Sequence, residues 1–119
     1  MKKYLLIASL ILLSLSSCDS STYESLEESQ IIVGEATYET NVKSIINSNC
    51  VSCHSVGGTA SFRPLTTYSE VKNAVLNTNL LDRIQRQNGE PGQMPQTGRM
   101  SQDKINTILQ WNADGLLEN

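Results

Sequence analysis

The chain of 119 residues has little of what most metal centres and large cores are built from. His54 is its only histidine, Phe62 its only phenylalanine and Trp111 its only tryptophan, and there are three cysteines. One histidine excludes a site held by several imidazoles. Few aromatic side chains leave a small domain with a limited core. An apolar group other than a side chain is therefore a candidate to fill its middle.

Basic residues are also scarce and form no stripe. Nine lysines and arginines face twelve acidic residues, a formal charge of −3. Without Lys2 and Lys3, which belong to the leader described below, seven face twelve and the balance is −5. A nucleic-acid partner is therefore not expected. The acidic balance favours solubility and permits a basic partner.

The sequence lacks an apolar run of the about 20 residues that a final membrane span takes. A shorter run, Tyr4 to Leu15, follows the basic start Met1-Lys2-Lys3. A basic start, a short apolar core and small residues before a cut site are typical of a secretory signal. Leu15-Ser16-Ser17-Cys18 resembles the lipobox of bacterial lipoproteins, in which the cysteine is lipidated and begins the mature chain. An ordinary signal peptide with an incidental cysteine is the alternative.

A lipid on Cys18 would hold the protein on a membrane from outside the cytoplasm, on the periplasmic side or at an outer membrane. The segment 19–30, DSSTYESLEESQ, is polar and rich in serine, which predicts a flexible tether. We therefore divide the chain into a signal peptide (1–17), a lipidated cysteine with its linker (18–34) and one small domain (35–119).

Helical spacing recurs in this domain while β-branched alternation is weak, so an all-α fold is predicted. Short helices are expected over residues 40–49, from 67, over 80–87 and from 101 to 115. Thr67 and Glu70 fit a capping box, and Asn79 and Ser101 stand at two further N-cap positions. The connecting segments 55–67 and 88–98 are long for a compact domain, which is acceptable where both enclose a ligand.

The stretch 49-NCVSCHSVGG-58 places Cys50, Cys53 and His54 close together, and two chemistries fit it poorly. A thiol–disulfide pair works when a helix N-terminus stabilises its first thiolate, whereas Cys50 follows the predicted end of a helix and no βαβ unit surrounds it. A structural zinc site takes four ligands. The motif supplies three, and the adjacent Cys53 and His54 are poorly spaced around one ion. Both chemistries stay open as alternatives.

Covalent attachment of c-type haem uses a Cys-x-x-Cys-His motif as it stands here. Cys50 and Cys53 would each add to a vinyl group of the porphyrin, and His54 would bind the iron from one side. One histidine suffices, because a methionine sulfur can be the other axial ligand. This attachment takes place outside the cytoplasm, in agreement with the signal peptide.

With these residues the chain resembles a small class I cytochrome c. Beside Cys50-Val51-Ser52-Cys53-His54, the segment 92-GQMPQTGRMSQDKINTILQWNADG-115 resembles the family's distal half, a methionine–proline loop followed by a helix with an aromatic residue. The resemblance covers residues 38–116. It implies a cytochrome c-like fold of short helices wrapped around one covalently bound haem c, and electron transfer rather than catalysis.

Met94 is the expected second axial ligand. Proline biases the residue before it toward extended backbone, and the family's ligand stands in a Gly-x-Met-Pro context such as Gly92 to Pro95. Met100 directly precedes the last helix, where a hydrophobic residue more often packs on the helix start. The resemblance therefore implies His54 and Met94 as iron ligands, with Met100 or no protein ligand as alternatives.

The family also implies supporting roles near the haem. A proline carbonyl after the motif accepts a hydrogen bond from the other ring nitrogen of the ligating histidine, and Pro64 is the only candidate. Arg63 is either a partner of a haem propionate or a solvated surface residue. Trp111 is expected to pack where the first and last helices cross.

Together these features predict a lipid-anchored carrier of single electrons outside the cytoplasm. Its redox partner would be an oxidase, a reductase or a dehydrogenase, met through a small transient interface. A haem-based sensor or ligand-binding protein is the alternative, with a missing or displaceable sixth ligand. A permanent accessory subunit of an oxidoreductase is another. No enzymatic activity of its own is expected.

Overall fold

The computed structural model describes residues 32–119, and helices make up the regular structure of that part. They are η2 (Tyr38–Val42), α2 (Lys43–Asn49), α3 (Tyr68–Asn77), α4 (Leu80–Gln85) and α5 (Gln102–Ala113). Among these residues the only β pairing is an isolated bridge between Thr37 and Leu117. The all-α prediction is confirmed for the described part. The predicted signal peptide, Cys18 and the segment 19–30 lie outside it.

The first helical segment begins two residues before its predicted start at residue 40 and changes type along its length. Its first turn, η2, is π-helical, and the Val42 N–H donates to the Thr37 carbonyl at 3.3 Å. Thr37 also caps this turn, because its Oγ1 accepts from the Thr40 N–H at 3.4 Å. The α-helix α2 then carries the chain to Asn49.

The predicted capping box at the start of α3 is confirmed. The Glu70 N–H donates to Thr67 Oγ1 at 3.3 Å, and the Glu70 carboxylate accepts from the Thr67 N–H at 3.0 Å. The same carboxylate accepts from the Thr66 hydroxyl and N–H, and these bonds lower the pKa of Glu70. Neighbouring residues alone therefore determine where α3 begins.

The other two predicted caps, Asn79 and Ser101, occupy their N-cap positions without making the capping hydrogen bond. Asn79 Oδ1 accepts instead from Arg83 Nε at 3.1 Å. The Leu80 N–H at the start of α4 donates a hydrogen bond to Thr78 Oγ1 at 3.2 Å. Both N-cap positions were predicted correctly, but neither side-chain cap forms; at Asn79 the neighbouring Thr78 and Arg83 side chains take the groups involved.

Three aromatic rings form the centre of the core, where η2, α3 and α5 meet. Tyr38 lies 5.8 Å from Trp111 and 5.6 Å from Tyr68, measured between ring centroids. Trp111 is fully buried, and its Nε1–H donates to the Leu117 carbonyl at 2.7 Å. Offset and edge-to-face rings add attraction to the apolar area they bury. Trp111 thus packs where η2 and α5 meet, as expected for the first and last helices, and its nearness to a haem stays a prediction.

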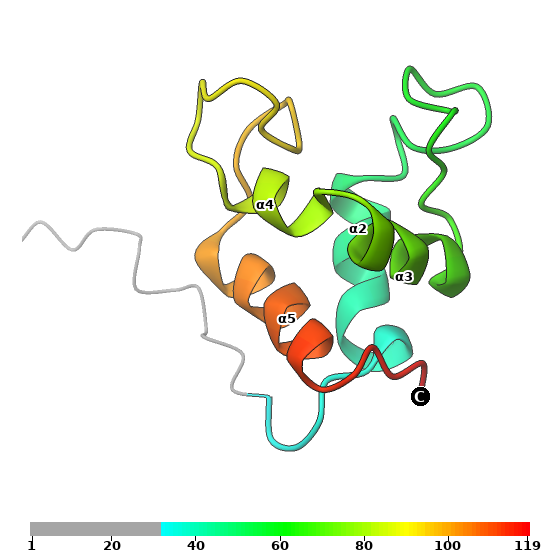
Figure 1. Cartoon of the computed structure of the whole chain (residues 1–119), viewed down its shortest axis with the longest axis vertical. Helices are drawn as coiled ribbons and strands as arrows, with labels where there is room; N and C mark the ends of the chain where they lie inside the picture. Colours follow the sequence, from blue (N-terminus) through cyan, green and yellow to red (C-terminus); the bar gives the residue numbers. More distant parts are fainter. Residues whose placement is uncertain (1–31) are drawn as a thin grey trace, which may run out of the picture.

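The two ends of the described chain meet beside these rings (Figure 1). The Tyr38 N–H donates to the Leu117 carbonyl at 2.9 Å, and the Ala36 N–H donates to Asp114 Oδ2 at 2.7 Å. We call residues 35–39 and 114–118 the entry end. Two long loops project from the helices on the opposite side (Figure 1). We call residues 50–66 the first loop and residues 86–101 the second loop. Together they form the loop end.

Candidate functional site

Cys50, Cys53 and His54 lie on one tight turn at the end of α2. The Cys50 N–H completes the helix by donating to the Ile46 carbonyl at 2.8 Å. The Cys50 carbonyl then accepts from the N–H groups of Cys53 (3.2 Å) and His54 (2.9 Å). Both cysteines are free thiols. The end of α2 therefore presents two thiols and an imidazole from a single rigid turn.

The two thiols differ in their surroundings. Cys53 is exposed, whereas Cys50 is half-buried against the core. Burial, and secondarily the nearby Cys53, raise the pKa of the Cys50 thiol to about 11. A thiol–disulfide switch needs a nucleophilic thiolate with a lowered pKa. The environment of Cys50 has the opposite effect, which argues against the thiol–disulfide alternative.

The ring of His54 is oriented by the backbone of the first loop. Its Nδ1 lies 2.7 Å from the Arg63 carbonyl oxygen. A carbonyl only accepts, so Nδ1 carries a proton and Nε2 is the ring nitrogen left to face another partner. Metal-ligating histidines are held in this way.

Pro64 was predicted to supply this carbonyl, and that detail is wrong by one residue. The Leu65 N–H donates to the His54 carbonyl at 2.8 Å, which sets the chain direction so that the carbonyl of Arg63 faces the ring. Pro64 lies between these two contacts and is half-buried. Its ring restricts Arg63 to extended backbone. Pro64 thus acts on the geometry of the loop rather than as the acceptor.

The first loop folds back closely over the motif. The Ala60 N–H donates to the Cys53 carbonyl at 2.9 Å. A Cβ atom on Gly58 would lie 2.2 Å from that same oxygen, so only glycine fits there. A Gly-Gly pair in a sequence indicates a break in regular structure and nothing more. The close approach depends on where residues 53 and 60 meet, which spacing alone does not reveal.

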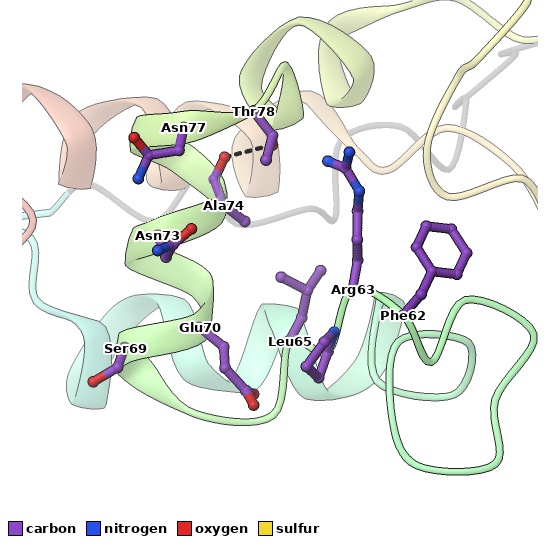
Figure 2. A pocket seen from close by; sticks show the side chains of 10 residues that line it. Phe62, Arg63, Leu65, Ser69, Glu70, Asn73, Ala74, Asn77 and Thr78 are labelled. Carbon is purple, nitrogen blue, oxygen red and sulfur yellow. Dashed lines mark hydrogen bonds between the residues drawn. The ribbon is translucent and has the colours of Figure 1, made fainter.

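A hollow of about 430 Å³ lies between the first loop and α3. Phe62, Arg63, Pro64 and Leu65 line it from the loop, and α3 contributes Glu70, Asn73, Ala74 and Asn77 among others. Figure 2 shows the Arg63 side chain extending past α3 toward Thr78, with Phe62 on the outer side. The residue whose backbone orients His54 therefore also places a cationic side chain and an apolar neighbour along a concave surface.

Met94 lies in the second loop, which is fastened to α4 and braced from inside. The Met94 N–H donates to the Arg83 carbonyl at 3.1 Å. Gln93 is buried, and its Nε2 donates to Asn88 Oδ1 and to the Pro95 carbonyl, each at 3.1 Å. Gln93 was not singled out in the sequence, because a polar residue in a loop ordinarily faces solvent. Its bonds keep Met94 at a defined place in the loop.

The two candidate methionines differ in burial. Met100 is 5% exposed and belongs to the hydrophobic core, as expected for a residue that packs on the start of a helix. Met94 is half-buried and outside that core. Packing therefore accounts for Met100 and leaves Met94 as the methionine available to a ligand.

Five of the predicted site residues come together in the first loop, and Met94 lies in the second loop at the same end of the molecule (Figure 1). The five are Cys50, Cys53, His54, Arg63 and Pro64. Over residues 32–119 no three His, Cys, Asp or Glu side chains are grouped so that they could hold a metal ion. A zinc site on this turn would therefore need ligands of another kind.

No described helix is both long enough and apolar enough to span a membrane. Comparisons of the chain with protein-family models, with curated proteins and with solved structures gave no match.

Proposed function

We propose that the chain is a lipid-anchored c-type cytochrome with one covalently bound haem and a cytochrome c-like fold, and that it carries single electrons outside the cytoplasm. The observation that carries this proposal is the His54 ring, held through Nδ1 by the Arg63 carbonyl beside two free thiols. A backbone-oriented imidazole next to a Cys-x-x-Cys pair is the donor set that haem c requires.

The residues of the first loop fit such a group chemically. Two thiols offer two covalent attachment points, and Nε2 of His54 offers one axial ligand. A histidine that binds iron through Nε2 keeps its proton on Nδ1, and the contact of Nδ1 with the Arg63 carbonyl suits that tautomer. Bound haem would supply a reversible one-electron iron couple.

The surrounding chain has three tasks in this proposal. The turn that begins at Cys50 holds the thiols and the imidazole in a fixed relation through the bonds to its carbonyl. The Arg63 carbonyl fixes the orientation of the His54 ring. The second loop offers the Met94 sulfur, whose place is set by Gln93 and by the bond to Arg83.

Methionine ligation favours a carrier over a catalyst. A thioether raises the reduction potential, and a filled sixth position leaves no open site at the iron. Arg63 is the candidate counter-charge for a propionate, because its backbone carbonyl contacts the His54 ring and its exposed side chain extends along the hollow (Figure 2). Cys18 would carry the lipid, and residues 19–34 would link it to the entry end.

The proposal is tested by the mass of the denatured protein after expression with the c-type maturation machinery. We expect the mature chain to keep the mass of one haem when unfolded, because thioether bonds survive denaturation. Bare polypeptide mass, with or without zinc in the native sample, would refute the proposal. Treatment with a lipoprotein lipase should separately remove the acyl mass from the segment that begins at Cys18.

A further inference from the structure

The hollow between the first loop and α3 is not part of the turn that would hold haem. Neither thiol of the motif lines it, nor does His54 or Met94, and of the predicted site residues only Arg63 and Pro64 do. Its volume of about 430 Å³ falls within the range of about 300–1,000 Å³ that is typical of small-molecule sites. The hollow therefore has room for a ligand of its own.

The wall that α3 contributes carries a row of neutral polar side chains. Ser69, Asn73 and Asn77 follow one another at intervals of four residues, which places them on one face of the helix. Figure 2 shows them on successive turns of α3. All three are exposed, and no side-chain hydrogen bond within residues 32–119 involves them. One hydroxyl and two carboxamides therefore offer free donors and acceptors without charge.

The other polar groups of the hollow are already engaged or offset. The Thr78 hydroxyl donates to the Ala74 carbonyl at 2.5 Å, and one oxygen of the Glu70 carboxylate accepts the bonds of the capping box. The negative charge of Glu70 is balanced by the positive charge of Arg63 on the opposite wall. The hydrogen-bonding capacity that remains free is uncharged, which favours a neutral ligand over an anion.

The wall that the first loop contributes is mostly apolar. Phe62 is 79% exposed, Pro64 is half-buried and Leu65 is buried. Figure 2 shows the Phe62 ring at the outer edge, on the side away from the polar row of α3. The face of an aromatic ring carries negative charge density and attracts polarised C–H groups. A pyranose sugar has such C–H groups on its faces and hydroxyl groups around its rim, so its two sides match the two walls.

We propose that the hollow is a binding site for a neutral saccharide of one or two sugar rings. Phe62 contacts a face of the sugar, while the amides of Asn73 and Asn77 bond its hydroxyl groups. This site goes beyond electron transfer, and it does not depend on haem, because no residue that would attach haem or bind its iron lines the hollow.

The test uses the mature chain from residue 18 with Cys18→Ser, loaded with haem by the maturation machinery and labelled with ¹⁵N. The probes are cellobiose, maltose and diacetylchitobiose at millimolar concentration, followed by saturation-transfer difference and by backbone amide shifts. We expect at least one of these sugars to bind and to shift amides in residues 62–65 and 69–78.

Two sets of variants assign the contacts. Asn73→Ala with Asn77→Ala should weaken binding about five- to fiftyfold, because each amide loses at least one hydrogen bond to the sugar. The matched pair Asn47→Ala with Asn112→Ala removes exposed amides from α2 and α5, outside the hollow, and should change binding less than about twofold. Phe62→Ala should weaken binding, and Phe62→Tyr should restore it because the ring is kept.

Absence of saturation transfer to all three sugars, or equal weakening by both asparagine pairs, would overturn the proposal. Inorganic phosphate that shifts the same amides, where the sugars do not, would make the hollow an anion site and would also overturn it. Binding by haem-free protein that the loaded protein lacks would assign the hollow to the haem site, with the same consequence. The denatured mass of each sample records its haem separately. A chain that acquires no haem and still binds a sugar in the hollow would refute the proposed function and leave the saccharide site standing.

Discussion

The entry end and the loop end of this domain are stabilised by different kinds of interaction. At the entry end Tyr38 is buried against Trp111, backbone bonds join residues 38 and 39 to 117 and 118, and the Ala36 N–H donates to the Asp114 carboxylate. At the loop end Val56 and Phe62 face solvent, and two long loops carry the thiols, the imidazole and Met94. The comparison teaches that the aromatic core stabilises the fold at one end, while the residues with chemistry are held by hydrogen bonds at the other.

The loops are nevertheless specified in detail. The first loop is held by bonds to the carbonyls of Cys53 and His54, and the second by Gln93 and Asn88. Asn88 Oδ1 also accepts from the Arg99 N–H at 2.7 Å, which closes the second loop at its base. Order without a packed core is what a preformed ligand site requires. Under the proposed function, the loop end would bind its cofactor without refolding the entry end.

The largest expected effect is the loss of covalently bound haem when both cysteines of the first loop are replaced. Cys50→Ala with Cys53→Ala should abolish haem staining in a denaturing gel, because no thiol remains to form a thioether. Each single variant should retain one bond and part of the stain. Full staining of the double variant would show that the haem is held in another way.

The next largest effect is the loss of stability expected when the aromatic core beside the entry end is disrupted. Trp111→Ala should lower the free energy of unfolding by about 3–5 kcal/mol, since it empties a fully buried site. Guanidinium titration measures this, and haem staining should persist in whatever protein is made. The control Trp111→Phe keeps an aromatic ring at this site but loses the Nε1–H bond to the Leu117 carbonyl, at a cost of about 1–3 kcal/mol. An unchanged unfolding midpoint for Trp111→Ala would mean that the aromatic rings do not stabilise the fold.

Substitution of the two methionines, Met94 and Met100, distinguishes a haem ligand from a core residue. Met94→Ala should lower the reduction potential and let carbon monoxide bind the reduced iron, because the thioether ligand is gone. Met100→Ala should cost about 2–5 kcal/mol of unfolding free energy and leave the potential unchanged. Redox titration of both variants decides the assignment. A reversed pattern would make Met100 the ligand.

A smaller effect is expected from the N-cap of α3. Thr67→Ala removes the hydroxyl that accepts from the Glu70 N–H and should cost about 1 kcal/mol, measured by chemical unfolding. Ser101→Ala is the matched control, because Ser101 makes no side-chain capping bond and its loss should have little effect. Equal costs at both positions would contradict the assignment of the capping box.

The smallest effect concerns pH. Hydrogen bonds from Thr66 and Thr67 hold the pKa of Glu70 below its usual value. The stability they contribute is therefore present above the unfolded-state pKa and is lost as the pH falls through the lower folded-state value. Glu70→Gln should flatten this acid limb of the unfolding curve. An unchanged limb would assign the acid sensitivity to other carboxylates.

How far the structure could be predicted depended on the range of the contacts involved. The capping box of Thr67 and Glu70 and the core position of Met100 follow from neighbours in sequence and are confirmed. The π-turn at Tyr38 and the Arg63 carbonyl on His54 depend on contacts between segments, so periodicity could not give them.

The C-terminal end of α4 was also not predicted correctly from the sequence. It was expected to reach Gln87 and ends at Gln85, because Arg86 is extended with ψ 149°. That conformation lets the Gln87 N–H donate to Glu90 Oε2 at 2.6 Å and starts the second loop. Helix propensity favoured two more residues, and the side chains of the loop outweighed it.

The most direct test is the optical spectrum, oxidised and reduced, of protein made with the c-type maturation machinery. We expect sharp reduced haem bands and, in the ferric state, the weak far-red band of methionine ligation. Haem bands without the far-red feature would shift the assignment toward a sensor or another sixth ligand. A protein without haem bands would contradict the claim that Cys50, Cys53 and His54 form a haem attachment site.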